Sequence, residues 1–124
     1  MAIPGSSDGQ EVLRRGAITG QSTSWTSFTF TGGSPSTGTN SYTVPANHIV
    51  TMLSIIWCEA AGNAESISLN QNDTTYILTL QALAANATFI WEERHMLKGG
   101  EKLQTLSTSG DVDVLYSYLD QDWS

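Results

Sequence analysis

The side chains best suited to hold a soft metal ion are His48, His95 and Cys58. They fall on different predicted elements, and none is spaced from another as in the paired motifs that bind zinc, such as H-x-x-x-H or C-x-x-C. We expect His48 to lie in a turn and His95, which follows Arg94, to cap the end of a strand. The pattern therefore predicts no metal site and no cofactor.

Acidic side chains occur in close pairs, which is the arrangement that general acid–base chemistry or a hard cation would need. Glu92 and Glu93 are adjacent, so on a strand they point to opposite faces and cannot act together. The remaining pairs can share a face and offer oxygen ligands, namely Asp111 with Asp113 and Asp120 with Asp122. None of them lies in a calcium-loop pattern with a glycine and a terminal glutamate, so we expect solvated acids.

Signatures of nucleophilic and nucleotide chemistry are also missing from the sequence. It contains no G-x-S-x-G elbow, no G-x-G-x-x-G loop and no Walker-type loop, and Gly99-Gly100 has the composition of an ordinary turn. We therefore predict that the chain is not an enzyme and has no catalytic residues.

Charge and cysteine content narrow the partners further. The formal net charge is −7, and no cationic block exists beyond Arg14-Arg15, which argues against nucleic acid and against an anionic membrane surface. Cys58 is the single cysteine, so an intrachain disulfide is impossible, and its apolar neighbours favour a buried thiol. No signal-peptide pattern is present, and the longest good apolar run, Ile49 to Cys58, is far shorter than the roughly 20 residues that span a bilayer.

Residues 1–22 contain Pro4, scattered glycines and few apolar side chains, which predicts an extended N-terminal arm. Two interpretations stay open: a frayed terminus, or an arm that orders against a neighbouring subunit. The isolated cluster Val12-Leu13-Arg14-Arg15 favours the second, because apolar and cationic anchors are unusual in plain linkers.

From residue 23 onward the pattern is that of β-strands. The segment Ile49 to Cys58 is apolar at both odd and even positions, so a strand here needs cover on both faces. One face would meet the core and the other a neighbouring subunit. Val112 to Leu119 alternates cleanly, and the other expected strands are separated by turns about every ten residues. Residues 23–124 are thus predicted to form an antiparallel β-sandwich, jelly-roll-like, of seven or eight short strands.

The tryptophans offer a second kind of surface. Trp57 and Trp91 lie on strong strands and are expected in the core or an interface, whereas Trp25 begins a strand. Trp123 either packs back on its own sandwich or anchors a subunit or partner interface, where tryptophan is enriched. Stacking of an exposed tryptophan on a sugar is the alternative, which would make the chain a carbohydrate-binding module.

Three stretches resemble a family of small virion proteins of tailed bacteriophages. They are Ala2-Ile3-Pro4-Gly5 with Glu11 to Arg15, the strand entry Tyr42 to His48 (YTVPANH), and the closing segment Gly110 to Ser124 (GDVDVLYSYLDQDWS). The similarity covers most of the chain in the order of its elements, although each motif is short.

The resemblance implies a non-enzymatic β-sandwich component of the phage particle, present in symmetric copies. A decoration or cement protein on the outer surface of the head is the first expectation, binding the major capsid protein through its arm and associating with itself, with a trimer favoured. A collar, neck, tail or fibre-associated component is the alternative. The interface residues predicted on these grounds are Val12, Leu13, Arg14, Arg15, Val50, Met52, Ile56 and Trp123.

Overall fold

The computed structural model describes residues 10–21, 23–31, 40–41 and 43–122, which form strands, turns and loops and contain no helix. Eleven strands are present in these ranges. Their bounds are β1 (Gln10–Gln21), β2 (Thr26–Ser27), β3 (Phe30–Thr31), β4 (Asn40–Ser41), β5 (His48–Glu59), β6 (Glu65–Gln71), β7 (Thr75–Leu83), β8 (Thr88–Trp91), β9 (His95–Lys98), β10 (Leu103–Ser107) and β11 (Val112–Asp122).

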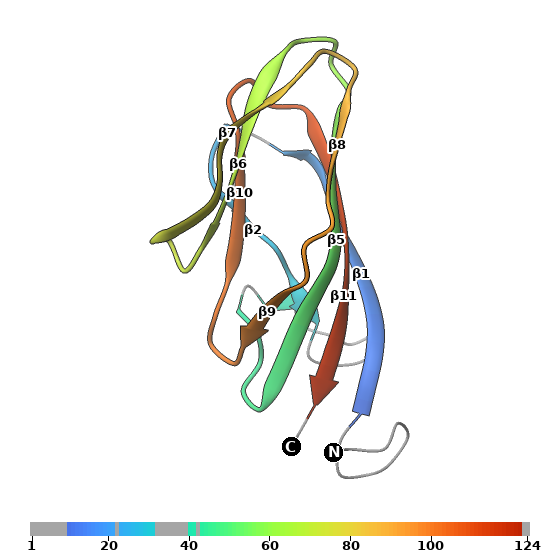
Figure 1. Cartoon of the computed structure of the whole chain (residues 1–124), viewed down its shortest axis with the longest axis vertical. Coiled ribbons are helices and arrows are strands. Elements are labelled where there is room, and N and C mark those ends of the chain that lie inside the picture. Colours follow the sequence, from blue (N-terminus) through green and yellow to red (C-terminus); the bar gives the residue numbers. More distant parts are fainter. Residues whose placement is uncertain (1–9, 22, 32–39, 42, 123–124) are drawn as a thin grey trace.

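The strands form two antiparallel layers (Figure 1). The five-stranded sheet has the order β1-β11-β5-β8, with β9 also paired to β5, and the four-stranded sheet has the order β2-β10-β6-β7. Strands β3 and β4 make a small separate pair. The predicted all-β, sandwich-like fold is confirmed. The strand number exceeds the predicted seven or eight because β1 lies in the segment expected to be an arm, and because residues 23–31 and 87–98 each form two short strands, β2 with β3 and β8 with β9.

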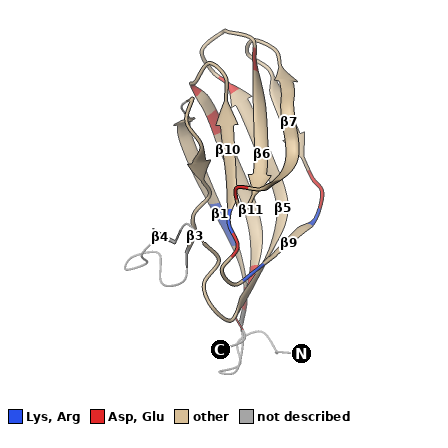
Figure 2. Cartoon of the chain, turned by 90° about the vertical axis from the view of Figure 1, so that its left-hand side faces the viewer, with Lys and Arg blue, Asp and Glu red and all other residues tan. Residues whose placement is uncertain are grey.

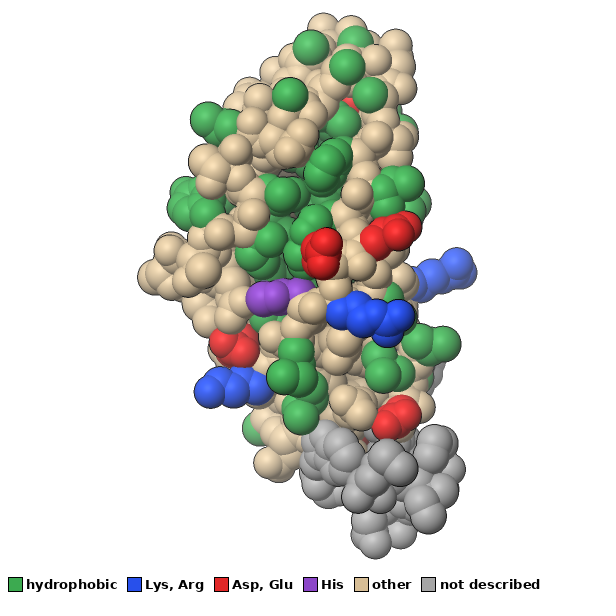
Figure 3. Space-filling model, in the orientation of Figure 1, with side chains coloured by type: hydrophobic (Ala, Val, Ile, Leu, Met, Phe, Trp, Pro, Cys, Tyr) green, Lys and Arg blue, Asp and Glu red, His purple; other side chains and the backbone are tan. Residues whose placement is uncertain are grey.

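Large side chains from both sheets fill the space between them. Val50, Met52, Ile55 and Trp57 of β5 are fully buried, and they belong to one core cluster with Ile67, Leu69 and Leu103 of the other sheet. The indole Nε1 of Trp57 donates to Thr105 Oγ1 at 3.0 Å, so its polar atom is satisfied across the core. On the side of the molecule seen in Figure 3, hydrophobic side chains continue along the strip between the two sheets.

A β-bulge in β5 explains why its sequence looked apolar on both faces. Ser117 pairs with Ser54 but Tyr118 pairs with Met52, which leaves Leu53 as an extra residue without a partner in β11. An extra residue shifts the alternation by one position. Val50 and Met52 therefore face the core before the bulge, and Ile55 and Trp57 face it after the bulge. Much of the apolar character that suggested a second covered face belongs to a single face.

The predicted arm is replaced over residues 10–21 by strand β1. This strand is antiparallel to β11 from Gln10, opposite Asp122, to Gln21, opposite Val112. The hydrogen-bond ladder pairs backbone N–H and C=O groups of β1 with those of β11. The glycines and few apolar side chains of this segment did not by themselves indicate a strand. A glycine is required at position 16 for a steric reason, because an added Cβ would lie 2.3 Å from the Tyr116 ring. Residues 1–9 lie outside the described residues, and there the arm stays a prediction.

Candidate functional site

The outer face of the five-stranded sheet carries two rows of apolar side chains. Because paired residues share a face, the register places Leu13, Leu119 and Met96 in one row, with the polar Thr51 between Leu119 and Met96. The second row contains Ala17, Leu115, Ile56 and Ile90. The exposed fractions of Leu13, Met96, Leu115 and Ile90 are 73, 65, 54 and 52%. Residues of this kind gathered on one face mark a candidate interaction surface.

The structure divides the predicted interface residues between this face and the interior. Leu13, Arg15 and Ile56 lie on the outer face. Val12 and Arg14 point the other way, because they pair with the inward residues Asp120 and Tyr118.

Val50 and Met52 are 0% exposed in the core of the chain itself, which removes them from any surface. The β5 bulge is the physical reason, since it turns both side chains inward. Trp123 lies outside the described residues.

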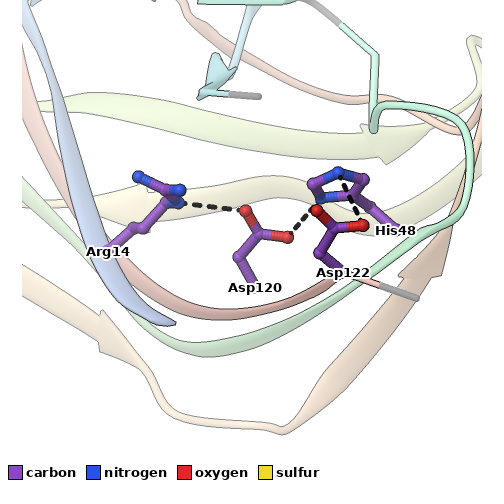
Figure 4. Close-up of polar contacts among 4 residues, drawn as sticks. All are labelled: Arg14, His48, Asp120 and Asp122. Atoms are coloured by element: carbon purple, nitrogen blue, oxygen red, sulfur yellow. Dashed lines mark hydrogen bonds and ion pairs between the residues drawn. The ribbon is translucent and has the colours of Figure 1, made fainter. Parts of the chain in front are cut away.

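Arg14 belongs to a polar cluster inside one end of the sandwich (Figure 4). Its Nε contacts Asp120 Oδ2 at 3.0 Å, and His48 Nδ1 is 2.7 Å from Asp120 Oδ1. Asp122 Oδ1 lies 3.6 Å from His48 Nε2. Both carboxylate oxygens of Asp120 are thus engaged within the fold, and the cluster ties the edge strand β1 to β11 and β5. The sequence predicted a turn position for His48 and solvated acids at 120 and 122; the strand register buries His48 and Asp120 instead.

A second carboxylate with a structural role is Glu59, at the end of β5. It accepts hydrogen bonds from the backbone N–H groups of Ala61, Gly62, Asn63 and Asn86, at 2.8 to 3.2 Å. The Asn86 bond, with the others, holds the pKa of Glu59 below its usual value. The carboxylate therefore fixes two loops at the same end of the molecule, a role that no spacing in the sequence indicated.

The remaining candidate ligands are placed apart. His95 begins β9, where its Nε2 lies 2.5 Å from Gln71 Oε1. Cys58 is half-buried on the outer face of β5, opposite Asp113, so the expected burial of its thiol is partial. Among the described residues, no group of three or more His, Cys, Asp and Glu side chains is arranged to hold a metal ion. The same residues contain no helix with the length and apolar character needed to cross a membrane.

The outer face of the four-stranded sheet is organised by two aromatic rings. Trp25, just before β2, and Tyr76, on β7, come from opposite edges of the sheet, and their ring centroids lie 5.9 Å apart at 76°. They border a hollow of about 280 Å³ that Ser68, Thr79, Leu80 and Leu106 also line. Figure 2 looks toward this sheet and shows charged residues mainly at its ends and in loops.

The fold and these surfaces define a sandwich-like all-β protein with two distinct outer faces. No protein-family model matches the chain, and no curated protein matches it significantly.

Proposed function

We propose that this chain is a non-enzymatic structural subunit that associates with copies of itself through the outer face of the five-stranded sheet. The observation that carries the proposal is the exposure of Leu13, Met96, Leu115 and Ile90 on one face, each more than half accessible. Covering apolar area releases roughly 25 cal/mol per Å², so a second protein surface stabilises the face more than water does.

The surroundings of the two rows suit a protein interface. Two charged residues lie at one end of the face: Glu11, which is opposite Gln121, and Lys98, which is opposite Ile49. Asp113 lies near the other end. Arg15, between the rows, is exposed and brings a planar donor group. Apolar centres with polar rims, enriched in arginine, are typical of stable interfaces.

For the fold we propose a jelly roll, and the strand order supports it. When the separate pair β3–β4 is left out, and β8 and β9, which both pair with β5, are counted as one strand, the eight strands in chain order give sheets 1-8-3-6 and 2-7-4-5. This pairing is that of the eight-stranded double-sheet jelly roll, an architecture used by viral capsid proteins and by lectins.

The setting that we propose is the virion of a tailed bacteriophage, which the sequence resemblance supports. In it the subunit decorates the outer surface of the head and contacts the major capsid protein; a collar, tail or fibre-associated position is the alternative. A trimer is the expected assembly. A closed trimer needs two different surfaces on each copy, and the apolar face with the open edge of β1 beside it offers two.

Sedimentation equilibrium of the purified chain tests self-association. The double variant Leu13→Lys with Leu115→Lys places a charge in each apolar row and should convert an oligomer into a monomer, with unchanged circular dichroism. Thr75→Lys, an exposed position on β7 of the other sheet, is the matched control and should leave the oligomer intact. A wild-type chain that stays monomeric at high concentration contradicts the proposal.

The virion setting has its own test, since an oligomer could form in another context. An electron-microscopy map of the intact particle should show copies of this jelly roll on the head surface, with the apolar face covered. Copies at the neck or tail would select the alternative position, and a particle without the chain would contradict the setting.

A further inference from the structure

The hollow between Trp25 and Tyr76 is built by an irregular stretch of β7. Between Ile67, opposite Gln81, and Leu69, opposite Leu78, β6 has one residue and β7 has two, Thr79 and Leu80. Such a bulge re-aims side chains, and bulges are common beside functional sites. Here Thr79 and Leu80 both line the hollow.

The backbone at Leu80 is held in an unfavourable conformation. Its φ of 49° is in the left-handed region, which a leucine rarely adopts. The N–H of Leu80 donates to Ser68 Oγ at 3.0 Å, and this bond fixes the bulge. Leu80 is nevertheless 60% exposed, so the strained backbone does not serve to bury its side chain in the core. Strain kept by a surrounding structure is a feature of ligand sites.

A buried acceptor without a partner lies on the same face. Asn70 is opposite Tyr76 on one side and Gln104 on the other, one outward position along β6 from Ser68. Its exposed fraction is 3%, and within the described residues its Oδ1 accepts no hydrogen bond. Asn70 is not among the residues that line the hollow, so this acceptor lies beneath the same face and beside the hollow.

We propose that this hollow binds one residue of a neutral polysaccharide. A pyranose ring has an apolar face of C–H groups and a perimeter of hydroxyl groups. The C–H face suits Trp25 and Tyr76, whereas a hydroxyl group can pair with Thr79, which lines the hollow. Apolar walls with a few convergent polar groups are the general design of small-molecule sites.

The distribution of charged residues favours a neutral sugar over an anionic one. Strands β2, β6, β7 and β10 contain a single charged residue, Glu65, which is buried at the start of β6. None of the six residues that line the hollow is charged. An anionic polysaccharide would therefore find no cation here, and a chain of net charge −7 would repel it.

The experiment is affinity electrophoresis with soluble β-glucan, galactomannan and dextran, together with tryptophan fluorescence. At least one neutral polymer should retard the wild type, and alginate, an anionic polymer, should not. Trp25→Ala and Tyr76→Ala should each weaken binding by about tenfold or more, and Thr79→Ala should also weaken it. Ala85→Ser, an exposed position in the turn between β7 and β8 and outside both proposed surfaces, is the control and should bind as the wild type does.

Circular dichroism shows whether each variant is folded. Because Tyr76 is more exposed than Trp25, Tyr76→Ala is expected to fold and still tests the site if Trp25→Ala does not fold. Absence of binding to all three neutral polymers overturns the proposal, and so does equal binding by Tyr76→Ala. The double variant Leu13→Lys with Leu115→Lys separates the two proposals, because its monomer should still bind the polymer.

Discussion

The five-stranded sheet leaves Leu13, Met96 and Leu115 more than half exposed on its outer face, whereas the four-stranded sheet buries Ser68 and Asn70 on its own outer face, near Trp25 and Tyr76. The strands of the larger sheet contain several charged residues, whereas those of the smaller sheet contain one, Glu65. The direction of the polar groups differs as well. In the larger sheet the polar ties, such as Arg14 with Asp120, point inward, and two rows of apolar side chains face outward. In the smaller sheet amide and hydroxyl groups point outward beside aromatic rings.

This difference assigns different tasks to the two faces. An open row of aliphatic side chains suits a broad protein contact, which is non-directional and depends on area. A hollow lined by aromatic rings and hydroxyl groups suits a small hydroxylated ligand, whose binding depends on the direction of its hydrogen bonds.

The largest loss is expected at the inward tie of the five-stranded sheet. The side chain of Asp120 is 4% exposed, and Asp120→Ala leaves Arg14 and His48 without their carboxylate partner. The change should lower the free energy of unfolding by about 3 kcal/mol. Urea denaturation measures it. Asp122→Ala is the control, since Asp122 is 38% exposed and more distant from His48, and its loss should stay below about 1 kcal/mol. Equal losses would show that Asp120 is not the tie.

Gly16→Val should be the next most damaging change. The new Cβ would meet Tyr116 Cζ and the hydroxyl oxygen at 2.3 Å, and that hydroxyl group binds both the N–H and the C=O of Thr29, at 3.0 and 2.9 Å. We expect a loss of about 2 to 3 kcal/mol by urea denaturation. Ala17→Val, the next residue and exposed on the outer face, should change stability by less than about 0.5 kcal/mol.

Truncation of one exposed apolar side chain on each face compares the faces directly. Trp25→Ala should cost about 1 to 2 kcal/mol, because the ring is 36% exposed and contacts Tyr76. Leu115→Ala should cost less than about 0.5 kcal/mol in the monomer, because its 54% exposed side chain has little cover there. Thermal unfolding at low concentration measures both. A larger loss at Leu115 would mean that the face is not bare in the single chain.

Two carboxylates, Glu65 and Glu101, should respond to pH in opposite ways. Burial raises the pKa of Glu65 above its usual 4.5, with help from the charges of Glu59 and Asp111. The folded chain then binds this proton more tightly than the unfolded chain, so Glu65 favours folding below pH 4.5 and loses that benefit as pH rises through the raised pKa. Glu65→Gln should therefore be more stable than the wild type near pH 7, and the gain should vanish near pH 4.

Glu101 supplies the matched comparison for this pH experiment. The backbone N–H of Lys98, with Asn72 and Gln71, lowers the pKa of Glu101, so its contribution is present above the usual 4.5 and is lost as pH falls through the lowered pKa. Glu101→Gln should be less stable than the wild type near pH 7, and the deficit should shrink in acid. The midpoints of urea denaturation of each variant and of the wild type, at the two pH values, measure these differences in stability. A difference of the same sign for both variants at pH 7 would contradict the assignment.

The smallest effect is expected at Leu80, and it is a gain. Glycine adopts a φ of 49° without steric cost, so Leu80→Gly should raise stability by about 0.5 kcal/mol after the larger chain entropy of glycine is subtracted. The same change removes one wall of the hollow and should weaken polysaccharide binding. Differential scanning calorimetry measures the gain, and a stability loss of 1 kcal/mol or more would show that the leucine side chain supports the fold.

Several features of the fold could be predicted from local pattern. The alternation in Val112 to Leu119 and the run from Ile49 to Cys58 indicated β11 and β5, and turn residues separated most of the other strands. Local pattern suffices there because a strand with one buried face repeats its apolar residues every second position. The same pattern failed for Gln10–Gln21, whose arginines and glycines make sense only beside β11.

The fold class, the acidic charge and the apolar strand segments follow from the amino-acid sequence, since each depends on neighbours along the chain. The direction of side chains around the β5 bulge, the pairing of Arg14 with Asp120 and the contact of Trp25 with Tyr76 follow from the packing of distant strands. Arg14 and Asp120 are 106 positions apart, and Trp25 and Tyr76 come from opposite edges of one sheet. Register sets such contacts, and register depends on how distant strands pair.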